Sequence, residues 1–357
     1  PLLKESNSEF GLKGLNFSFG YNKLRDYNQN IVMSGINNSS SLVDDFVYTA
    51  NLNDDWDPYT DELAWETYLI DFYATDTVTG DGYYYSDFDN SNYGQSERRS
   101  VKTLGSLGEY VFNLGANIGD KIYFGGSFGI QKLNYQETWI HTEEDPDDVI
   151  DYFKAYSFRN VLETEGRGFN AKIGILAKPT NWIRLGASIH TPTFFKMNDN
   201  FTSSMETDLA DGEGTHSYSA YGEFDYEIVT PFRAIGSVAL LYKNRAMFSL
   251  DYEFVDYSNA RMNSSDYDFY NENQAINKRY GSASNIRAGA EVVFGPFYIR
   301  GGYSVYGSPY VSGEPNEDMV KTSISGGLGF RTNRINLDFA LVQSSWEQQY
   351  YLYGNNA

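Results

Sequence analysis

Hydrophobic and polar residues alternate along many short segments of the chain, and residues 121–131 show the pattern well. Ile122, Phe124, Phe128 and Ile130 occupy one parity, whereas the other parity holds glycine and polar residues. Successive side chains of a β-strand point to opposite faces, so this alternation predicts a strand with one apolar and one polar face. The repeats follow one another without helices between them, which favours antiparallel hairpins.

Eleven strands are predicted from this alternation. Their approximate ranges are 12–28, 99–118, 121–142, 158–178, 182–204, 216–242, 245–262, 282–294, 297–306, 318–332 and 335–353. Short turns such as Gly119-Asp120 and Gly295-Pro296 separate strands within a hairpin, and longer polar loops such as 143–157 and 263–281 connect the hairpins. Short turns at one end and long loops at the other are typical of outer-membrane β-barrels, whose long loops are extracellular.

The sequence therefore predicts an all-β fold, a transmembrane antiparallel β-barrel in which residues 1–357 form a single domain in the bacterial outer membrane. Residues 29–98 are expected to form a long, acidic extracellular loop with helices. Bacterial single-chain barrels have even numbers of strands, so the odd number predicted here implies further strands outside this chain.

The parity of each residue assigns it to one face of the barrel. Apolar residues of one parity are expected to face lipid, among them Ile173, Leu185, Phe248, Ile286 and Phe339. The opposite parity carries Lys172, Arg184, His190, Asp251, Glu253, Arg287, Glu291, Arg300, Arg331 and Asp338. A charge facing lipid at mid-depth costs a few kcal/mol, so these residues are expected to line the lumen. Their mixed signs suggest pairing rather than a channel of one sign.

The composition is compatible with a barrel. Hydrophobic residues make up 41% of the chain and the mean hydropathy is −0.50, and no apolar run approaches the roughly 18 residues of a membrane helix. The 31 Tyr and 24 Phe suit membrane interfaces, where an apolar ring carries a polar tip. An aromatic-rich soluble β-protein is the alternative. The chain has no cysteine, and its net charge of −21 argues against nucleic acid as a partner.

The acidic residues are unevenly distributed, because no Lys or Arg occurs between Arg25 and Arg98. A solvated loop explains this segment. A divalent-cation site is the alternative, and it would involve Asp54, Asp55, Asp57 and Asp61. Their spacing lacks the glycine and the terminal glutamate of a calcium loop. We therefore predict neither a metal site nor a cofactor.

Helical spacing of apolar residues occurs only in the loops. One helix is predicted from Ser41, a second after Asp57-Pro58, and a third after Asp145-Pro146. The apolar residues after Asp57-Pro58 are Leu63, Trp65, Tyr68, Leu69 and Phe72. Such helices form either a core within the loop or a groove in which apolar ligands land.

No credible active site is present, and we expect a protein that is not an enzyme. Gly125-Gly126-Ser127-Phe128-Gly129 matches the G-x-S-x-G motif, but that motif requires a strand-to-helix turn and here lies within a strand. His141, His190 and His216 are scattered and lack the spacing of a metal pair.

Several motifs resemble the Bacteroidetes branch of the FadL-like family of outer-membrane transporters for long-chain fatty acids and hydrocarbons. They are Asn16–Asn22 (NFSFGYN), Ser39–Asp44 (SSSLVD), Gly168–Gly174 (GFNAKIG), His190–Thr193 (HTPT), Thr230–Arg233 (TPFR) and Asp251–Ser258 (DYEFVDYS). The resemblance extends over most of the chain. It implies a fourteen-stranded barrel plugged by an N-terminal hatch, of which the hatch, the first strands and the closing strand are expected to lie outside this chain.

The resemblance also implies uptake of long-chain fatty acids or other hydrophobic compounds by lumen binding and lateral release. Leu63, Trp65, Tyr68, Leu69 and Phe72 would then receive the ligand at the loop, and Arg184 or Arg300 would meet a carboxylate in the lumen. Outer-membrane lipid, such a ligand and other outer-membrane proteins are the expected partners. The alternative is a non-transporting barrel subunit of a complex for protein secretion or barrel assembly.

Overall fold

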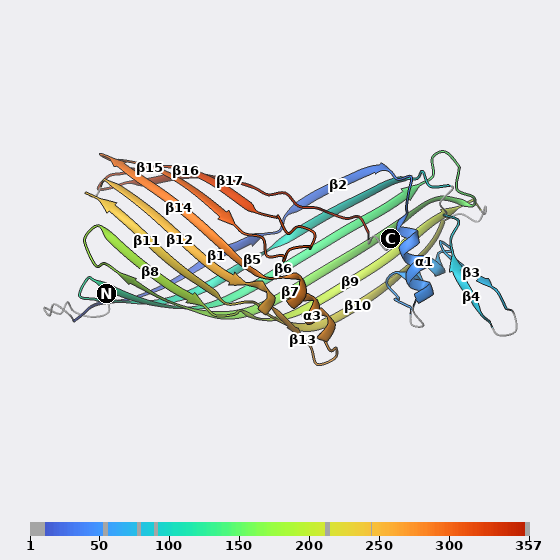
Figure 1. Ribbon diagram of the computed structural model, residues 1–357, viewed down its shortest axis with the longest axis horizontal. Helices are drawn as coiled ribbons and strands as arrows, with labels where there is room; N and C mark the ends of the chain where they lie inside the picture. The colour runs from blue at the N-terminus through green and yellow to red at the C-terminus, as the bar shows by residue number, and fades with distance from the viewer. Residues whose placement is uncertain are drawn as a thin grey trace.

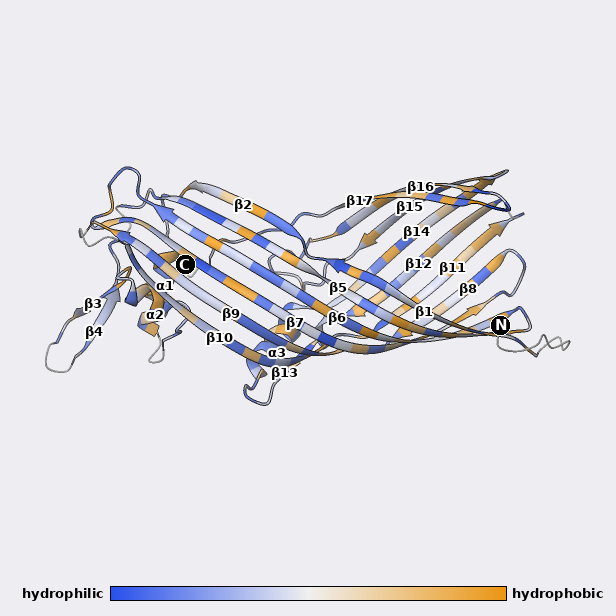
Figure 2. Cartoon of the chain, turned by 180° about the vertical axis from the view of Figure 1, so that it is seen from behind, coloured by the Kyte–Doolittle hydropathy of each residue, from blue (hydrophilic) through white to orange (hydrophobic). Residues whose placement is uncertain are grey.

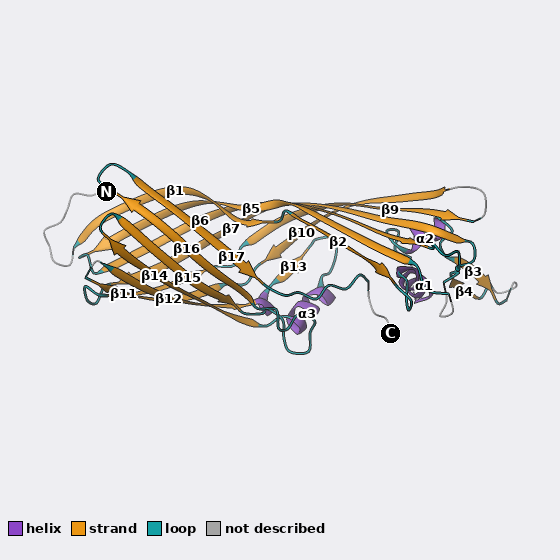
Figure 3. Ribbon diagram, turned by 90° about the horizontal axis from the view of Figure 1, so that it is seen from above, coloured by secondary structure: helices purple, strands orange, loops and turns teal. Residues whose placement is uncertain are grey.

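The computed structural model describes residues 11–52, 56–76, 80–88, 92–210, 215–243 and 245–353. Within these ranges the chain is almost entirely antiparallel β-structure with a few short helices (Figures 1 and 3). The strands are β1 (Leu12–Asp26), β2 (Gln29–Ile36), β3 (Asp71–Ala74), β4 (Gly82–Tyr85), β5 (Ser96–Ile118), β6 (Ile122–Glu144), β7 (Phe153–Ala177), β8 (Ile183–His190), β9 (Phe194–Leu209), β10 (Thr215–Val229), β11 (Arg233–Tyr242), β12 (Ala246–Asp256), β13 (Arg261–Asn263), β14 (Ser282–Phe294), β15 (Phe297–Tyr306), β16 (Lys321–Arg331) and β17 (Asn336–Ser345). The helices are α1 (Leu42–Leu52), α2 (Asp61–Glu66), the 3-10 turn η1 (Tyr257–Asn259) and α3 (Tyr270–Arg279).

One curled sheet of 15 strands contains all strands except the β3–β4 hairpin. Its main path is β1-β5-β6-β7-β8-β11-β12-β14-β15-β16-β17, with neighbours antiparallel throughout. The predicted all-β, antiparallel architecture is confirmed. None of the helices in the described ranges has the length and apolar character required to cross a bilayer.

For two segments the prediction of one continuous strand is wrong, because each segment forms two strands. The segment 182–204 forms β8 and β9, and the segment 216–242 forms β10 and β11. Pro192 and Pro231 lie at the two breaks, and proline cannot donate to a strand ladder. The breaks are adjacent, because Thr193 N donates to Thr230 Oγ1 at 2.9 Å and Thr230 N donates to Thr193 O at 3.0 Å.

The breaks divide the sheet into two parts. β7 passes through both, pairing with β9 over Phe153–Phe169 and with β8 over Lys172–Ala177. We call the part formed by β2, β9, β10 and residues 96–108, 132–144 and 153–167 the projecting sheet, and the remainder of the main path the wall. The projecting sheet extends away from the wall on the side that carries α1, α2 and the β3–β4 hairpin (Figure 1).

The wall has one apolar face and one polar face, as the parities predict. On the outward face Ile173 is 64% exposed and Phe339 is 69% exposed. Apolar residues recur at intervals along β11, β12 and β14 (Figure 2). The outward apolar side chains include Phe17, Phe19, Phe112, Phe128, Leu185, Phe248, Leu250, Ile286, Ile299, Leu328 and Leu337.

Charged residues on the inward face pair with one another across neighbouring strands. Arg300 contacts Glu291 at 2.6 Å and Asp338 at 2.5 Å. Arg287 contacts Glu253 at 3.1 Å, and Arg331 lies 3.6 Å from Asp338. The predicted pairing of mixed charges is therefore confirmed for these residues.

The loop helices pack on the projecting sheet and form a compact core. Val43 and Leu63 are fully buried there, together with Phe46, Ile70, Phe153 and Met205. Glu143 of β6 accepts hydrogen bonds from Leu42 N at 2.9 Å and Ser41 Oγ at 2.6 Å. A carboxylate is favoured at the positive N-terminus of a helix, so the sheet itself caps α1.

Three predictions about the loops need correction. The third helix after Asp145-Pro146 does not form, because Asp145 Oδ2 instead accepts from Ile150 N at 2.6 Å across a turn. The second helix begins at Asp61, since Asp57 Oδ1 caps a turn at Tyr59 N that precedes it. α3 lies in the segment 263–281, which was predicted as a loop.

The last predicted strand also ends earlier than expected, at Ser345 rather than at residue 353. The chain then crosses to the projecting sheet, where the Tyr353 hydroxyl donates to Glu97 Oε1 at 2.9 Å. Arg99 donates to Leu352 O. Burial, and secondly the nearby Glu143 carboxylate, raise the pKa of Glu97 to about 7.

We predict that Glu97→Gln flattens the dependence of stability on pH. The folded protein binds more protons than the unfolded chain between pH 4.5 and about 7, so its stability falls as pH rises through that window. Above it the variant should be more stable than the parent by on the order of 1–3 kcal/mol. Urea unfolding followed by tryptophan fluorescence measures this, and Glu144→Gln, an exposed carboxylate, is the control. Parallel profiles for Glu97→Gln and the parent would contradict the assignment.

Candidate functional site

Small residues make the wall thin where β6, β7, β8 and β11 lie side by side. Gly125 pairs with Gly174, which pairs with Ser188, so three small residues form one row on the inward face. On the outward face, Ala187 pairs with Gly236. Because these positions carry little or no side chain, both faces of the sheet are hollowed at the same place.

Two depressions occupy the opposite faces of this thin region. The outward one has a volume of about 690 Å³ and an almost entirely apolar lining, which includes Ile189, Ala234, Gly236, Tyr252 and Phe254. The inward one measures about 490 Å³, and its own lining includes the polar residues Ser127, Lys172, His190 and Ser237. Both are lined by Phe124, Gly125, Ile173, Gly174, Ile175, Ala187 and Ser188. Only one layer of strands separates them.

The double proline break borders this region. At the break, Ala171 N donates to Thr191 Oγ1 at 3.0 Å, and Thr191 N donates to Ala171 O at 2.9 Å. Side-chain hydroxyls thus replace part of the backbone ladder on this side of β7, whereas the pairing of β7 with β6 on the other side has no register shift. Sequence reasoning missed this feature, although the Thr-Pro dipeptides inside two unusually long predicted strands were a signal for it.

A buried polar cluster supports the inward face beside the break. Glu109, only 1% exposed, accepts hydrogen bonds from Lys172 at 2.5 Å, Gln131 at 3.0 Å and Asn170 at 3.2 Å. Asn170 in turn donates to Thr193 Oγ1 at 3.1 Å. A buried carboxylate is tolerated only when it is paired and hydrogen-bonded. The cluster therefore ties β5, β6 and β7 to the break.

The predicted loop residues separate into buried and exposed groups. Leu63 and Leu69 belong to the loop core, where their exposed fractions are 0% and 5%. Trp65 is exposed, and its ring lies 5.9 Å from the ring of Tyr84. Trp56 and Phe72 also contact Tyr84, at ring separations of 4.8 and 5.0 Å. Tyr68 is exposed and stacks edge-on with His216.

The two predicted arginines differ in their surroundings. Arg300 is held between Glu291 and Asp338. Arg184 lies on β8 and points to the inward face, because its neighbour Leu185 is on the outward face. Within the described residues its side chain forms no ion pair or hydrogen bond. Arg184 is thus the arginine with an available guanidinium group.

The other residues considered for catalysis or metal binding from the sequence are a serine, histidines and aspartates. Ser127 lies in mid-strand and donates to Asn113 Oδ1 at 2.5 Å. His141 is buried and hydrogen-bonded to Glu143 at 2.9 Å. Asp54 and Asp55 lie outside the described residues, and within the described ones no cluster of three potential metal ligands occurs.

Comparison with known proteins finds similarity only at the level of solved structures. No family model and no curated protein matches the chain. A Pseudomonas aeruginosa FadL homologue matches with 11% identity and a TM-score of 0.46, covering 93% of this chain and 80% of that one. The Pseudomonas putida toluene transporter TodX matches with 13% identity and a TM-score of 0.41, covering 72% of this chain and 75% of that one. A TodX deltaS2S3 mutant, described as a monoaromatic hydrocarbon channel, matches with 12% identity, a TM-score of 0.41 and the same coverage.

We predict that Gly129→Ala destabilises the polar cluster. A Cβ atom at Gly129 would lie 2.6 Å from Glu109 Oε1 and 2.8 Å from Asn170 Oδ1, and such overpacking typically costs about 1–3 kcal/mol. Gly125→Ala, four residues earlier on the same strand, is the matched control because no atom lies within 4 Å of its added Cβ. Urea unfolding in detergent micelles compares the two. Equal midpoints would contradict the tight packing around Glu109.

Proposed function

We propose that this chain forms the wall of an outer-membrane barrel for the uptake of long-chain fatty acids or similar hydrophobic compounds. The ligand binds on the inward face and leaves sideways through the thin region of the wall into the bilayer. The pair of depressions that share seven lining residues on opposite faces carries this proposal.

The two faces of the wall support a membrane location. Exposed apolar side chains cover the outward face over many strands, far beyond the scattered apolar residues normal on soluble proteins. Within the described residues β1 and β17 are the ends of the main path and do not pair with each other. Unpaired backbone is costly in lipid, so we propose that further strands close the barrel between these edges.

The energetics of an apolar ligand favour a sheltered route. Each methylene group removed from water gains roughly 0.8 kcal/mol, so an acyl chain that leaves the lumen through water would lose most of its binding energy. The outward depression beside Gly236 and Ile189 offers an apolar surface directly behind the inward one. The weakened ladder at Pro192 and Pro231 provides the place where strands can move apart.

The loop and the lumen would contribute to ligand capture. The cluster formed by Trp56, Trp65, Phe72 and Tyr84 presents partly exposed aromatic rings on the side of α1 and α2. It replaces Leu63 and Leu69 as the proposed landing surface, since those two residues are buried. Arg184 would meet the carboxylate of a fatty acid, because its side chain has no partner in the part of the chain that the structure describes and charge-assisted hydrogen bonds are strong.

A second candidate function is that of a subunit in an outer-membrane complex for protein secretion or barrel assembly. The free edge of β10 favours it, because within the described residues β10 pairs on that side only over Glu227–Val229 with β13. An open strand edge can accept a strand from another protein. Purification from the membrane in a mild detergent distinguishes the candidates: a stable protein complex supports the second, and a lone barrel argues against it.

We predict that Gly236→Phe reduces uptake of a labelled long-chain fatty acid by cells. The added ring fills the outward depression, so the leaving acyl chain can place about two fewer methylene groups against the apolar lining. At roughly 0.8 kcal/mol for each methylene group, we expect uptake to be roughly tenfold slower. Gly326→Phe is the control, since both glycines have open space around an added Cβ and both face outward. If both variants transport the fatty acid as fast as the parent does, the proposal of release through this region is wrong.

We also predict that Arg184→Gln weakens fatty-acid binding by about tenfold or more, the value of a hydrogen bond to a charged group. Binding of an alkane of equal length should not change, because it carries no carboxylate. Arg300→Gln is the control, as Glu291 and Asp338 already occupy that guanidinium. Titration in detergent micelles measures all three proteins. An equal loss for acid and alkane would exclude a carboxylate contact at Arg184.

A further inference from the structure

Three positive side chains form a row on the outward face where the wall meets the projecting sheet. Lys132 of β6 pairs in register with Arg167 of β7, and Arg167 pairs with Lys196 of β9. Neighbouring strands lie about 4.8 Å apart, so the row spans roughly 10 Å. We call Lys132, Arg167 and Lys196 the basic row. Such a concentration of positive charge is unexpected in a chain with a net charge of −21.

An apolar row lies directly beside the basic row, two residues toward the wall. It consists of Ile130, Phe169 and Phe194, which are all exposed and pair in register on the same three strands. Phe169 and Phe194 stack at a ring separation of 5.4 Å. Two residues along a strand correspond to about 7 Å. The outward surface thus changes from apolar to cationic over two residues along the strands.

On the far side of the basic row the surface becomes polar and acidic. Asn134, Glu165 and Asn198 form the next row, and Asp225 of β10 continues it. Glu227 stands beside Lys196 at the end of the basic row. The sequence of apolar, cationic and polar rows matches the acyl, phosphate and aqueous layers at a membrane surface.

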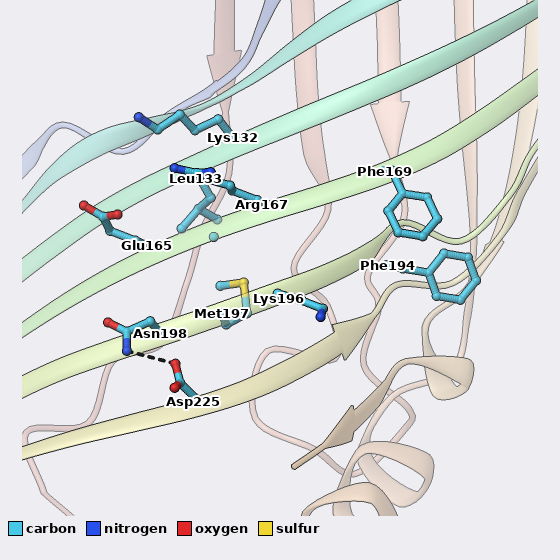
Figure 4. A pocket seen from close by; sticks show the side chains of 11 residues that line it. Lys132, Leu133, Glu165, Arg167, Phe169, Phe194, Lys196, Met197, Asn198 and Asp225 are labelled. Atoms are coloured by element: carbon cyan, nitrogen blue, oxygen red, sulfur yellow. Dashed lines mark hydrogen bonds between the residues drawn. The ribbon is translucent and has the colours of Figure 1, made fainter. Parts of the chain in front are cut away.

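The basic row is accessible and forms part of a depression. All three side chains are exposed, and they form no ion pair within the described ranges. A depression of about 440 Å³ is lined by the three cations together with Phe169, Phe194 and Glu165. Figure 4 shows Phe169 and Phe194 side by side at one end of it, with Lys132 and Arg167 toward the other.

We propose that the basic row binds the phosphate of a lipid headgroup in the outer leaflet, with the lipid's acyl chains against Ile130, Phe169 and Phe194. This inference rests on the proposed barrel in the outer membrane. The helices α1 and α2 pack on the projecting sheet, and the long loops of such barrels are extracellular, so we place the row at the extracellular boundary of the apolar surface. Three cationic side chains on adjacent strands bind a phosphate more tightly than a single one does, because each contributes a charge-assisted hydrogen bond.

The test compares lipid A that carries its phosphates with lipid A from which they have been removed, titrated onto the folded chain in neutral detergent micelles. The variant combines Lys132→Gln, Arg167→Gln and Lys196→Gln. A cation near a membrane surface contributes about 1 kcal/mol, so affinity for the phosphorylated lipid should fall roughly fivefold per residue and about a hundredfold for all three.

The matched control combines Arg98→Gln, Lys102→Gln and Arg159→Gln. These cations are also exposed on the outward face, but they pair with Thr142, Thr138 and Ile140, about 20 Å or more beyond the basic row. The control should bind like the parent. The single variant Arg167→Gln, with an expected loss of about fivefold, serves if the triple variant fails to fold.

Each result has a distinct meaning. Tighter binding of the phosphorylated lipid, lost in the basic-row variant only, supports the site. Equal binding of both lipids by the parent, or equal loss in variant and control, overturns it. Failure of the parent to insert into lipid vesicles would overturn the proposed membrane location instead. If the parent inserts into vesicles and takes up fatty acid normally, but the basic-row variant binds phosphorylated lipid A as tightly as the parent does, only this site is overturned.

Discussion

The register between strands is the constraint on which the rest of the structure depends. β5 and β6 pair without a shift from Ser96 and Glu144 to the turn at Ile118 and Ile122. Side chains alternate with a period of two, so a slip by one residue would turn the charges outward and the apolar residues inward. The ion pairs of Arg300 and Arg287 on the inward face form only in the observed register. Apolar patterning and charge pairing therefore select the same alignment.

The same register makes local deviations meaningful. Because neighbouring strands are aligned, Pro192 and Pro231 fall side by side, and Gly125, Gly174 and Ser188 form one row. A single proline or glycine would change the sheet little, but together these residues create a thin region next to an interrupted ladder. The buried cluster around Glu109 holds the neighbouring strands in place. The interrupted ladder and the buried cluster thus lie next to each other, and this arrangement suits the lateral release that we propose.

Alternation predicted the strands well because it is a local property: each residue type reflects which of the two faces of its strand it occupies. It predicted the wrong continuity at 182–204 and 216–242, since the alternation continues across both prolines while the backbone pairing does not. The helix α3 was missed because its residues are mostly polar and carry no apolar stripe. Leu63 was assigned to a ligand surface because helical spacing cannot distinguish a face that packs on a sheet from one that meets a ligand.

The sequence by itself determined the strand content, the two faces of each strand and the pairing of mixed charges, because these follow from residue type and parity. Tertiary structure alone decided which residues meet across strands. It placed Lys132, Arg167 and Lys196 in one row and buried Leu63 while leaving Trp65 exposed. It paired Arg300 with Glu291 and Asp338, whereas Arg184 has no ion pair among the residues that the structure describes. These outcomes depend on register and on packing between segments far apart in the chain, and neither is a property of any single segment.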